Sequence, residues 1–140
     1  MPTKSDLKKL AKVRLEEAEH LYRKKLYDGC VYLCGYVIEF ALKARICRIL
    51  KLDDYPEKGE VGRIFKTHDF DVLKLLAGLQ DEITITKNKQ LFDNWSIATK
   101  WKPEQRYSPA GTYNASNAKD ILSSIKDKQS GVLTWLSKRW

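Results

Sequence analysis

Residues 27–50 decide the fold, and they read YDGCVYLCGYVIEFALKARICRIL. One apolar stripe follows Val31, Ile38 and Leu42 at helical spacing, and the opposite side of the same helix is apolar as well. A helix that is apolar on both sides must be packed on both. This segment is therefore expected to be the central helix of a small helical bundle.

One carboxylate, Glu39, lies in the middle of that apolar surface. Lys43 follows four residues later, at the spacing where opposite charges pair along a helix. Charged side chains enter protein cores mostly as pairs. The first interpretation of Glu39 and Lys43 is thus a structural polar core.

Length and composition indicate one soluble domain over residues 1–140. No apolar run approaches the roughly 20 residues that cross a bilayer. The first twelve residues, MPTKSDLKKLAK, lack the apolar stretch of an export signal, so the cytoplasm is the expected location. The three cysteines lack the paired spacing and accompanying histidines of a zinc site. We therefore expect free core cysteines, no metal and no other cofactor.

The chain has 26 Lys and Arg residues and 18 Asp and Glu residues, which gives a net charge of +8. This positive charge favours a polyanionic partner. Cations that displace counterions from phosphates bind nucleic acid without regard to its sequence. Nucleic acid is favoured over a membrane surface as that partner. Solvated lysines on helix faces explain the charge equally well.

Two helices are predicted to form a hairpin at the start of the chain. The first begins near Thr3 or Ser5, either of which can cap it, and ends near residue 25. Asp28 and Gly29 indicate the tight turn that makes the second helix antiparallel to the first.

The remaining helices are expected to cover this hairpin. A short third helix is predicted from a cap at Thr67, a fourth over residues 87–101, and a last one from Asn114 or Ser116 that continues through Gly131. Residues 52–62 form the main loop, and ITIT at residues 83–86 is a weak strand candidate.

Three motifs carry a family resemblance. They are GYVIEFALKA at residues 35–44, THDFDVLKLL at residues 67–76 and WxxxxRY at residues 101–107. With them, the chain resembles the HEPN domain family (higher eukaryotes and prokaryotes nucleotide-binding domain) from about residue 10 to residue 125. The resemblance implies an all-α, up-and-down antiparallel bundle of about five helices, and frequent homodimers. It also implies a role in prokaryotic defence or toxin–antitoxin systems, in which some members work with a minimal nucleotidyltransferase and others bind nucleotides.

Many HEPN proteins are metal-independent ribonucleases with an arginine four to six residues before a histidine, and RIFKTH at residues 63–68 fits that formula. His68 would transfer protons, Arg63 would hold the phosphate, and Lys66 and Thr67 would add contacts. The predicted helix start at His68 would add free amides that favour an anion. An ordinary capping or packing histidine and a solvated arginine are the alternatives for His68 and Arg63.

A second group of candidate residues lies in the loop after the fourth helix and consists of Trp101, Lys102, Arg106 and Tyr107. Lys102, Arg106 and Tyr107 are the candidate binding residues, and sealing the bundle is favoured for Trp101. Mixed aromatic and cationic side chains can stack bases and hold phosphates, or they can seal the end of the bundle. Arg106 can also be placed near Glu39 or the His68 loop, and the sequence leaves this open.

Two hypotheses follow for the function. The first is a binding module for a nucleotide, RNA or a partner nucleotidyltransferase; the alternative is a ribonuclease toxin with Arg63 and His68 in a dimer cleft. We favour the binding module, because the arginine–histidine motif comes early in the chain and Phe70 stands where ribonuclease members often have a tyrosine. A homodimer is expected in either case, with Trp135 and Trp140 as candidate contacts.

Overall fold

The computed structural model describes residues 1–140 and contains seven α-helices, one 3-10 helix and no strand. The elements are α1 (Lys4–Arg23), α2 (Tyr27–Ile49), α3 (Gly59–Gly62), α4 (Phe70–Leu76), α5 (Lys89–Ala98), η1 (Pro103–Tyr107), α6 (Ala115–Lys126) and α7 (Val132–Leu136). The predicted all-helical fold is confirmed. The two short helices α3 and α7 and the 3-10 helix η1 add to the roughly five helices expected.

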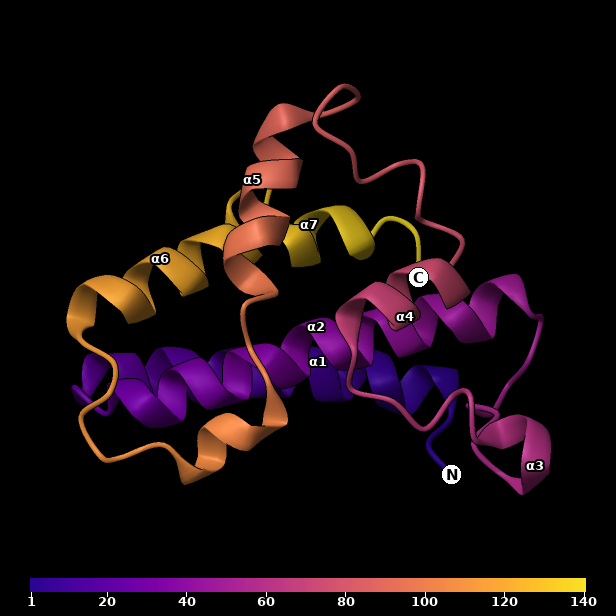
Figure 1. Ribbon diagram of the computed structural model, residues 1–140, viewed down its shortest axis with the longest axis horizontal. Coiled ribbons are helices and arrows are strands. Elements are labelled where there is room, and N and C mark those ends of the chain that lie inside the picture. Colours follow the sequence, from indigo (N-terminus) through magenta and orange to yellow (C-terminus); the bar gives the residue numbers. More distant parts are fainter.

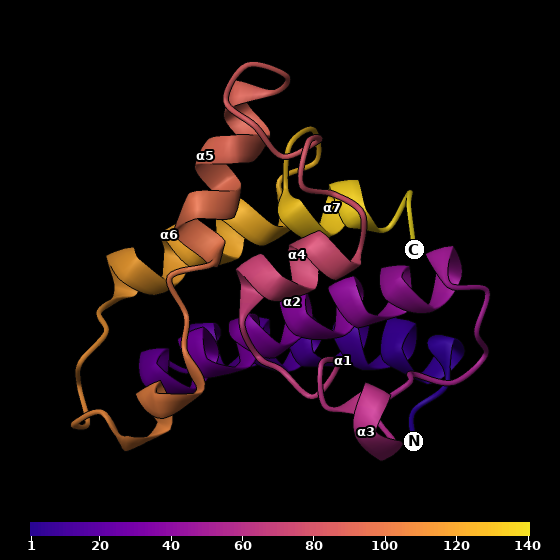
Figure 2. The ribbon, with the colours of Figure 1, turned by 45° about the vertical axis from the view of Figure 1, so that its right-hand side comes forward.

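Helix α2 is the centre of the bundle, as its two-sided apolar pattern predicts. It lies along α1, while α4, α6 and α7 pack on its other side. Figures 1 and 2 show α6 and α7 above the α1 and α2 pair, with α5 standing steeply across them. One cluster of 29 buried apolar residues runs through these elements, and the three cysteines of α2 are buried and free.

The turn of the first hairpin lies earlier than predicted. Thr3 caps α1 in a capping box with Asp6, but the turn falls at Lys24, Lys25 and Leu26, and Lys25 takes a left-handed φ of 62°. Asp28 was expected in this turn, but it lies in the first turn of α2. Its carboxylate accepts hydrogen bonds from the backbone N–H groups of Gly111 at 2.6 Å and Tyr113 at 2.9 Å. It thereby ties the loop after η1 to the start of α2.

The third predicted helix begins two residues later than expected. Its cap is Asp69, whose Oδ1 atom accepts from the N–H groups of Asp71 at 2.9 Å and Val72 at 3.2 Å. Thr67 was predicted as the cap and instead accepts from the N–H of Asp69 at 3.0 Å. The weak strand candidate at residues 83–86 is wrong, because this segment is a series of turns before α5.

The last predicted helix is two helices. Asp127 leaves the helical region with ψ at 133°, and its carboxylate accepts from the N–H groups of Gln129 at 3.1 Å and Ser130 at 2.7 Å. The prediction that the helix continues through Gly131 is wrong. A Cβ atom at Gly131 would lie only 2.5 Å from the backbone N of Asp127, so this sharp break needs a glycine.

Candidate functional site

The polar centre of the bundle is a chain of three side chains on two elements. Glu39 of α2 is 2% exposed, and its Oε1 atom accepts a hydrogen bond from Lys43 Nζ at 2.8 Å. Its other oxygen, Oε2, accepts from His68 Nδ1, also at 2.8 Å. Both oxygens of the buried carboxylate are therefore satisfied by cationic or polar donors, one from its own helix and one from the loop before α4.

Tyr55 holds the loop that carries His68. This tyrosine is fully buried, its hydroxyl donates to the backbone carbonyl of Phe65 at 2.7 Å, and Lys43 Nζ lies 5.1 Å from the centre of its ring. Burial, followed by the nearby charge of Glu39, raises the pKa of Tyr55. The phenol therefore stays protonated and can donate its hydrogen bond. Tyr55 thus contacts both the loop before α4 and Lys43 of the buried Glu39–Lys43 pair.

An aromatic wall borders His68 on its other side. The ring of Tyr36 meets the imidazole edge-on at 6.5 Å between centres and meets Trp101 at 5.0 Å. Tyr36 also forms a hydrogen bond with the Tyr32 hydroxyl at 3.2 Å, and burial together with that bond raises the pKa of Tyr36 to about 12. The imidazole is thus fixed in orientation, while 52% of the His68 side chain remains exposed.

His68 opens into a hollow of about 610 Å³ between the α4 start and the segment after α5. Its lining residues are Lys66, Thr67, His68, Asp69, Phe70, Asp71, Thr99, Trp101, Lys102, Pro103 and Glu104. Two lysines face three carboxylates there, so the lining is close to neutral rather than strongly positive. Asp69 also occupies the amides at the start of α4, which removes the free helix-start donors expected from the sequence.

The structure brings some of the candidate residues together and separates others. His68, Lys66, Thr67 and Lys102 line the same hollow. Arg63 is exposed at the end of α3 and does not line it.

Arg106 and Tyr107 also lie outside that lining. The guanidinium of Arg106 lies 4.9 Å from the centre of the Tyr107 ring, and the Tyr107 and Tyr32 hydroxyls raise the pKa of Arg106. Arg106 therefore contacts tyrosines. The sequence left open whether Arg106 reaches Glu39, and in the structure His68 contacts Glu39 instead.

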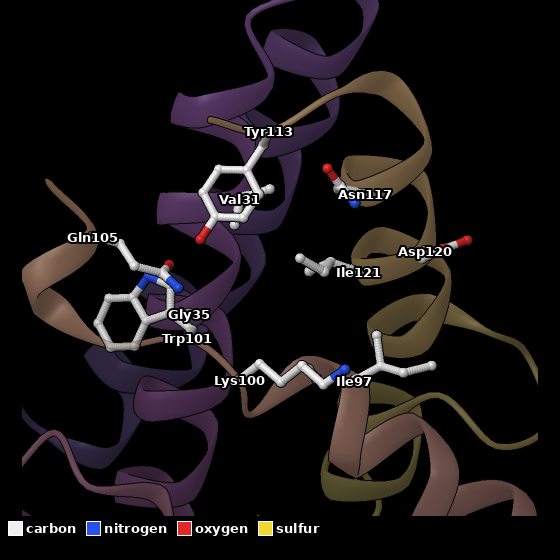
Figure 3. Close-up of a pocket in the computed structure, with 11 residues that line it drawn as sticks. Val31, Gly35, Ile97, Lys100, Trp101, Gln105, Tyr113, Asn117, Asp120 and Ile121 are labelled. Atoms are coloured by element: carbon white, nitrogen blue, oxygen red, sulfur yellow. The ribbon is translucent and has the colours of Figure 1, made fainter. Parts of the chain in front are cut away.

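Two features of the site are not evident from the sequence pattern. The first is the Glu39–His68 contact, which joins residues 29 positions apart. The carboxylate of Glu39 in the middle of the apolar surface was the available signal, since such a group needs donors for both oxygens. The second is a separate pocket behind Trp101, lined by residues of α2, α5 and α6 together with the adjoining segments (Figure 3).

A group of cationic side chains lies away from the hollow, around Trp140. Lys8 and Lys12 each place Nζ 5.7 Å from the centre of the Trp140 ring, and Arg48 donates to the Trp140 carbonyl. Desolvation, and then the charges of Lys4, Arg48 and Lys12, lower the pKa of Lys8. A group of like charges without salt-bridge partners is an attractive surface for a polyanion.

The arrangement can perform proton transfer at one nitrogen. Because Nδ1 of His68 donates to the Glu39 carboxylate, the Nε2 atom of a neutral imidazole carries the lone pair that accepts a proton. No group of three or more His, Cys, Asp or Glu side chains is placed to hold a metal ion. No helix has the length and apolar character needed to cross a membrane.

Fold and site together define a small helical-bundle protein with a buried carboxylate that positions a half-exposed histidine. The chain belongs to the HEPN domain family, whose HEPN domain matches residues 5–135 and thus nearly the whole chain. The resemblance inferred from the three motifs is confirmed. Membership places the protein among nucleotide-binding, RNA-binding or ribonuclease-type modules. No curated protein and no solved structure matches the chain significantly.

Proposed function

We propose that this protein is a nucleotide- or RNA-binding HEPN module of a prokaryotic defence or toxin–antitoxin system that works with a minimal nucleotidyltransferase. The observation that carries the proposal is the His68 side chain, held by Glu39 and still 52% exposed at the hollow. A histidine that only packed the core would be covered. One held rigidly at the surface is positioned to meet a ligand.

The ligand class follows from the charge. The chain carries a net charge of +8, Lys66 and Lys102 lie at the two sides of the hollow, and the Lys8 and Lys12 group offers a further cationic surface. The near-neutral lining suits a single phosphate or ribose contact better than a cluster of phosphates. An extended RNA strand that contacts both cationic surfaces accounts for more of this charge than one free nucleotide does.

RNA binding should depend on the two lysines of the hollow. We expect Lys66→Ala combined with Lys102→Ala to weaken binding of single-stranded RNA and to reduce the slope of log K against log salt by up to about 1.4, since each phosphate contact contributes about 0.7. Fluorescence anisotropy of a labelled RNA at several salt concentrations measures both quantities.

The matched control replaces two exposed lysines outside the hollow, Lys24 and Lys128, with alanine. An equal loss in this control would show that the hollow has no special role. Absence of RNA and nucleotide binding by the unaltered protein at low salt would overturn the proposal itself.

A homodimer is also part of the proposal, and α3 offers the surface for it. Val61 and Ile64 are 78% and 62% exposed on either side of Arg63. Trp135 and Trp140, the candidates from the sequence, are partly buried against their own core, and Trp135 is covered by Arg139 at 3.8 Å. A dimer through α3 would carry Arg63 of one copy toward the partner copy.

Light scattering should therefore give twice the chain mass of 16.3 kDa at micromolar concentration. We expect Val61→Ser with Ile64→Ser to give the monomer mass, because apolar side chains at the centre of an interface provide most of its affinity. Val13→Ser with Ile85→Ser, at two other exposed apolar positions, is the control and should remain dimeric. A monomer mass for the unaltered protein would contradict the dimer.

The proposed nucleotidyltransferase partner needs its own test. Co-expression with a nucleotidyltransferase encoded by a neighbouring gene, followed by size-exclusion chromatography, shows whether the two proteins form a complex.

The alternative function is metal-independent RNA cleavage, and the Glu39–His68 contact is the observation that favours it. A carboxylate on Nδ1 orients the ring and leaves Nε2 as a base for the 2′-hydroxyl of RNA. Charge on the phosphorane would need a cation such as Lys66, Lys102 or Arg63 of a partner copy. Its test is given in the Discussion.

A further inference from the structure

Tyr107, the last residue of η1, is the most solvent-exposed aromatic residue of the protein. It is 78% exposed, whereas every other Phe, Trp and Tyr residue is buried or partly buried. A ring in water contributes nothing to the hydrophobic core of its own chain. Of the two roles open to this loop, Trp101, at 5% exposure, seals the bundle, and Tyr107 does not.

Arg106, the residue before it, lies against the same ring. The guanidinium carbon lies over the Tyr107 ring, 4.9 Å from its centre, and no carboxylate forms a salt bridge with this arginine. With the guanidinium on one face, an exposure of 78% leaves the other face of the ring open to solvent. We call these two side chains the Arg106–Tyr107 pair. It offers an open aromatic face beside a cation that lacks a counter-charge.

The element that carries the pair is anchored on both sides, and η1 packs on α2 as the short orange coil beside that helix in Figure 1. Before η1, Trp101 lies directly on Gly35, where a Cβ atom would come within 2.0 Å of the indole (Figure 3). After η1, the carboxylate of Asp28 accepts hydrogen bonds from two backbone N–H groups of the next loop, at 2.6 and 2.9 Å. A side chain on an anchored element needs less ordering when it binds a ligand.

Helix η1 leads from the His68 hollow to the pair. Its first two residues, Pro103 and Glu104, line that hollow together with Lys102. A 3-10 helix rises about 2 Å per residue, so Tyr107 lies only about 8 Å along η1 from Pro103. An RNA strand with one phosphate at Lys102 therefore reaches Tyr107 within its next few nucleotides.

We propose that the Arg106–Tyr107 pair is a base-stacking site for single-stranded RNA. A base lies on the open face of the Tyr107 ring, and the N–H groups at the edge of the Arg106 guanidinium contact the adjoining phosphate. Every base has a flat aromatic face, so such a site accepts any of the four. The inference rests on the proposed function, because it assigns how a strand that leaves the hollow is held by a base.

RNA is favoured over a protein partner because the ring stands apart from other apolar side chains in its segment. The core of a protein interface is a group of apolar and aromatic residues, whereas Glu104, Arg106 and Ser108 around Tyr107 are polar and exposed. The local charge also suits a phosphate chain. Residues 100–107 contain three cationic side chains and one carboxylate.

Two substitutions separate stacking from charge. Tyr107→Ala should weaken binding of a short single-stranded RNA about 5- to 150-fold, since one stacked base contributes about 1–3 kcal/mol, and should leave the slope of log K against log salt unchanged. Arg106→Ala should weaken binding and also reduce that slope by about 0.7. Tyr107→Phe keeps the ring and should bind as the unaltered protein does. Fluorescence anisotropy at several salt concentrations measures affinity and slope.

Inorganic polyphosphate supplies phosphate charge without bases. Its affinity should be unchanged in Tyr107→Ala and lowered in Arg106→Ala. Ile85→Ala alters another exposed apolar residue, 55% exposed, and should not affect RNA binding. As a direct readout, irradiated RNA that contains iodouridine should form a crosslink that peptide mass spectrometry locates at Tyr107. Because Tyr107 is exposed, its variants should keep the circular dichroism spectrum of the unaltered protein.

Four results would overturn the inference, and they differ in what else they affect. Equal losses of RNA and polyphosphate affinity in Tyr107→Ala would show that no base is recognised. Unchanged RNA affinity in Tyr107→Ala, with binding that depends on Lys66 and Lys102, would remove the stacking site and leave the proposed function intact. If Tyr107→Ala instead disrupted only a complex with the nucleotidyltransferase, the pair would belong to a protein interface. Absence of RNA and nucleotide binding by the unaltered protein would remove both the stacking site and the proposed function.

Discussion

Replacing Glu39 with alanine should lower the free energy of unfolding by about 3 to 5 kcal/mol, the largest stability effect expected in this chain. Glu39 is 2% exposed, and its removal leaves the Lys43 ammonium, 8% exposed as a residue, without a counter-charge in the core. It also removes the acceptor that holds His68. Chemical denaturation followed by circular dichroism measures the change.

Two further variants separate the cost of an unpaired charge from the loss of packing. Glu16→Ala is the control, because this glutamate is also helical but its side chain is 74% exposed and contacts only His20 at 4.0 Å; its effect should be within about 0.5 kcal/mol. Glu39→Met with Lys43→Met replaces the pair by apolar groups and should cost less than Glu39→Ala alone. Equal losses for Glu39→Ala and Glu16→Ala would show that the pair does not stabilise the core.

If the protein cleaves RNA, changing His68 to asparagine should reduce the rate by about 10² to 10⁴, because it removes the group that transfers the proton. In this mechanism, Nε2 of His68 takes the proton of the 2′-hydroxyl and the 2′-oxygen forms a bond to phosphorus. The bond to the 5′-oxygen breaks, and that oxygen takes a proton from an acid such as the protonated His68 of a partner copy or water. The product is a 2′,3′-cyclic phosphate, which mass spectrometry detects.

The assay uses a labelled RNA in the presence of a chelator. Asparagine can still donate a hydrogen bond to Glu39, so an intact helical spectrum is expected for His68→Asn. His20→Ala changes the other histidine, which is 64% exposed on α1, and should retain full activity. Arg63→Lys should also be slower, because lysine keeps the charge and loses the two-pronged donor geometry.

The outcomes of this assay decide between the two functions. Cleavage that persists in His68→Asn, or that requires added magnesium, rules out the mechanism. No cleavage of any RNA, together with binding that depends on Lys66 and Lys102, favours the binding module.

The sequence by itself determined the helical class, the central helix and the family. The pattern of residues 27–50 predicts a helix packed on two sides, and α2 has buried residues around its whole circumference, from Cys30 to Cys47. The sequence offered two candidate caps for each of α1 and α6, and the observed caps, Thr3 and Asn114, are among them, since capping depends on residues within one turn. These features are local, so the order of residues is enough to specify them.

Only the tertiary structure decided the composition of the site. Glu39 and His68 meet because Tyr55 fixes the path of the loop between them, and no periodic pattern encodes that path. The same holds for Trp101, which lies on Gly35 although 66 positions separate them in the chain. Arg63 is only five positions before His68, yet it lies outside the hollow. Local patterns specify helices, whereas contacts across loops depend on how the helices pack, and this packing placed the candidate site.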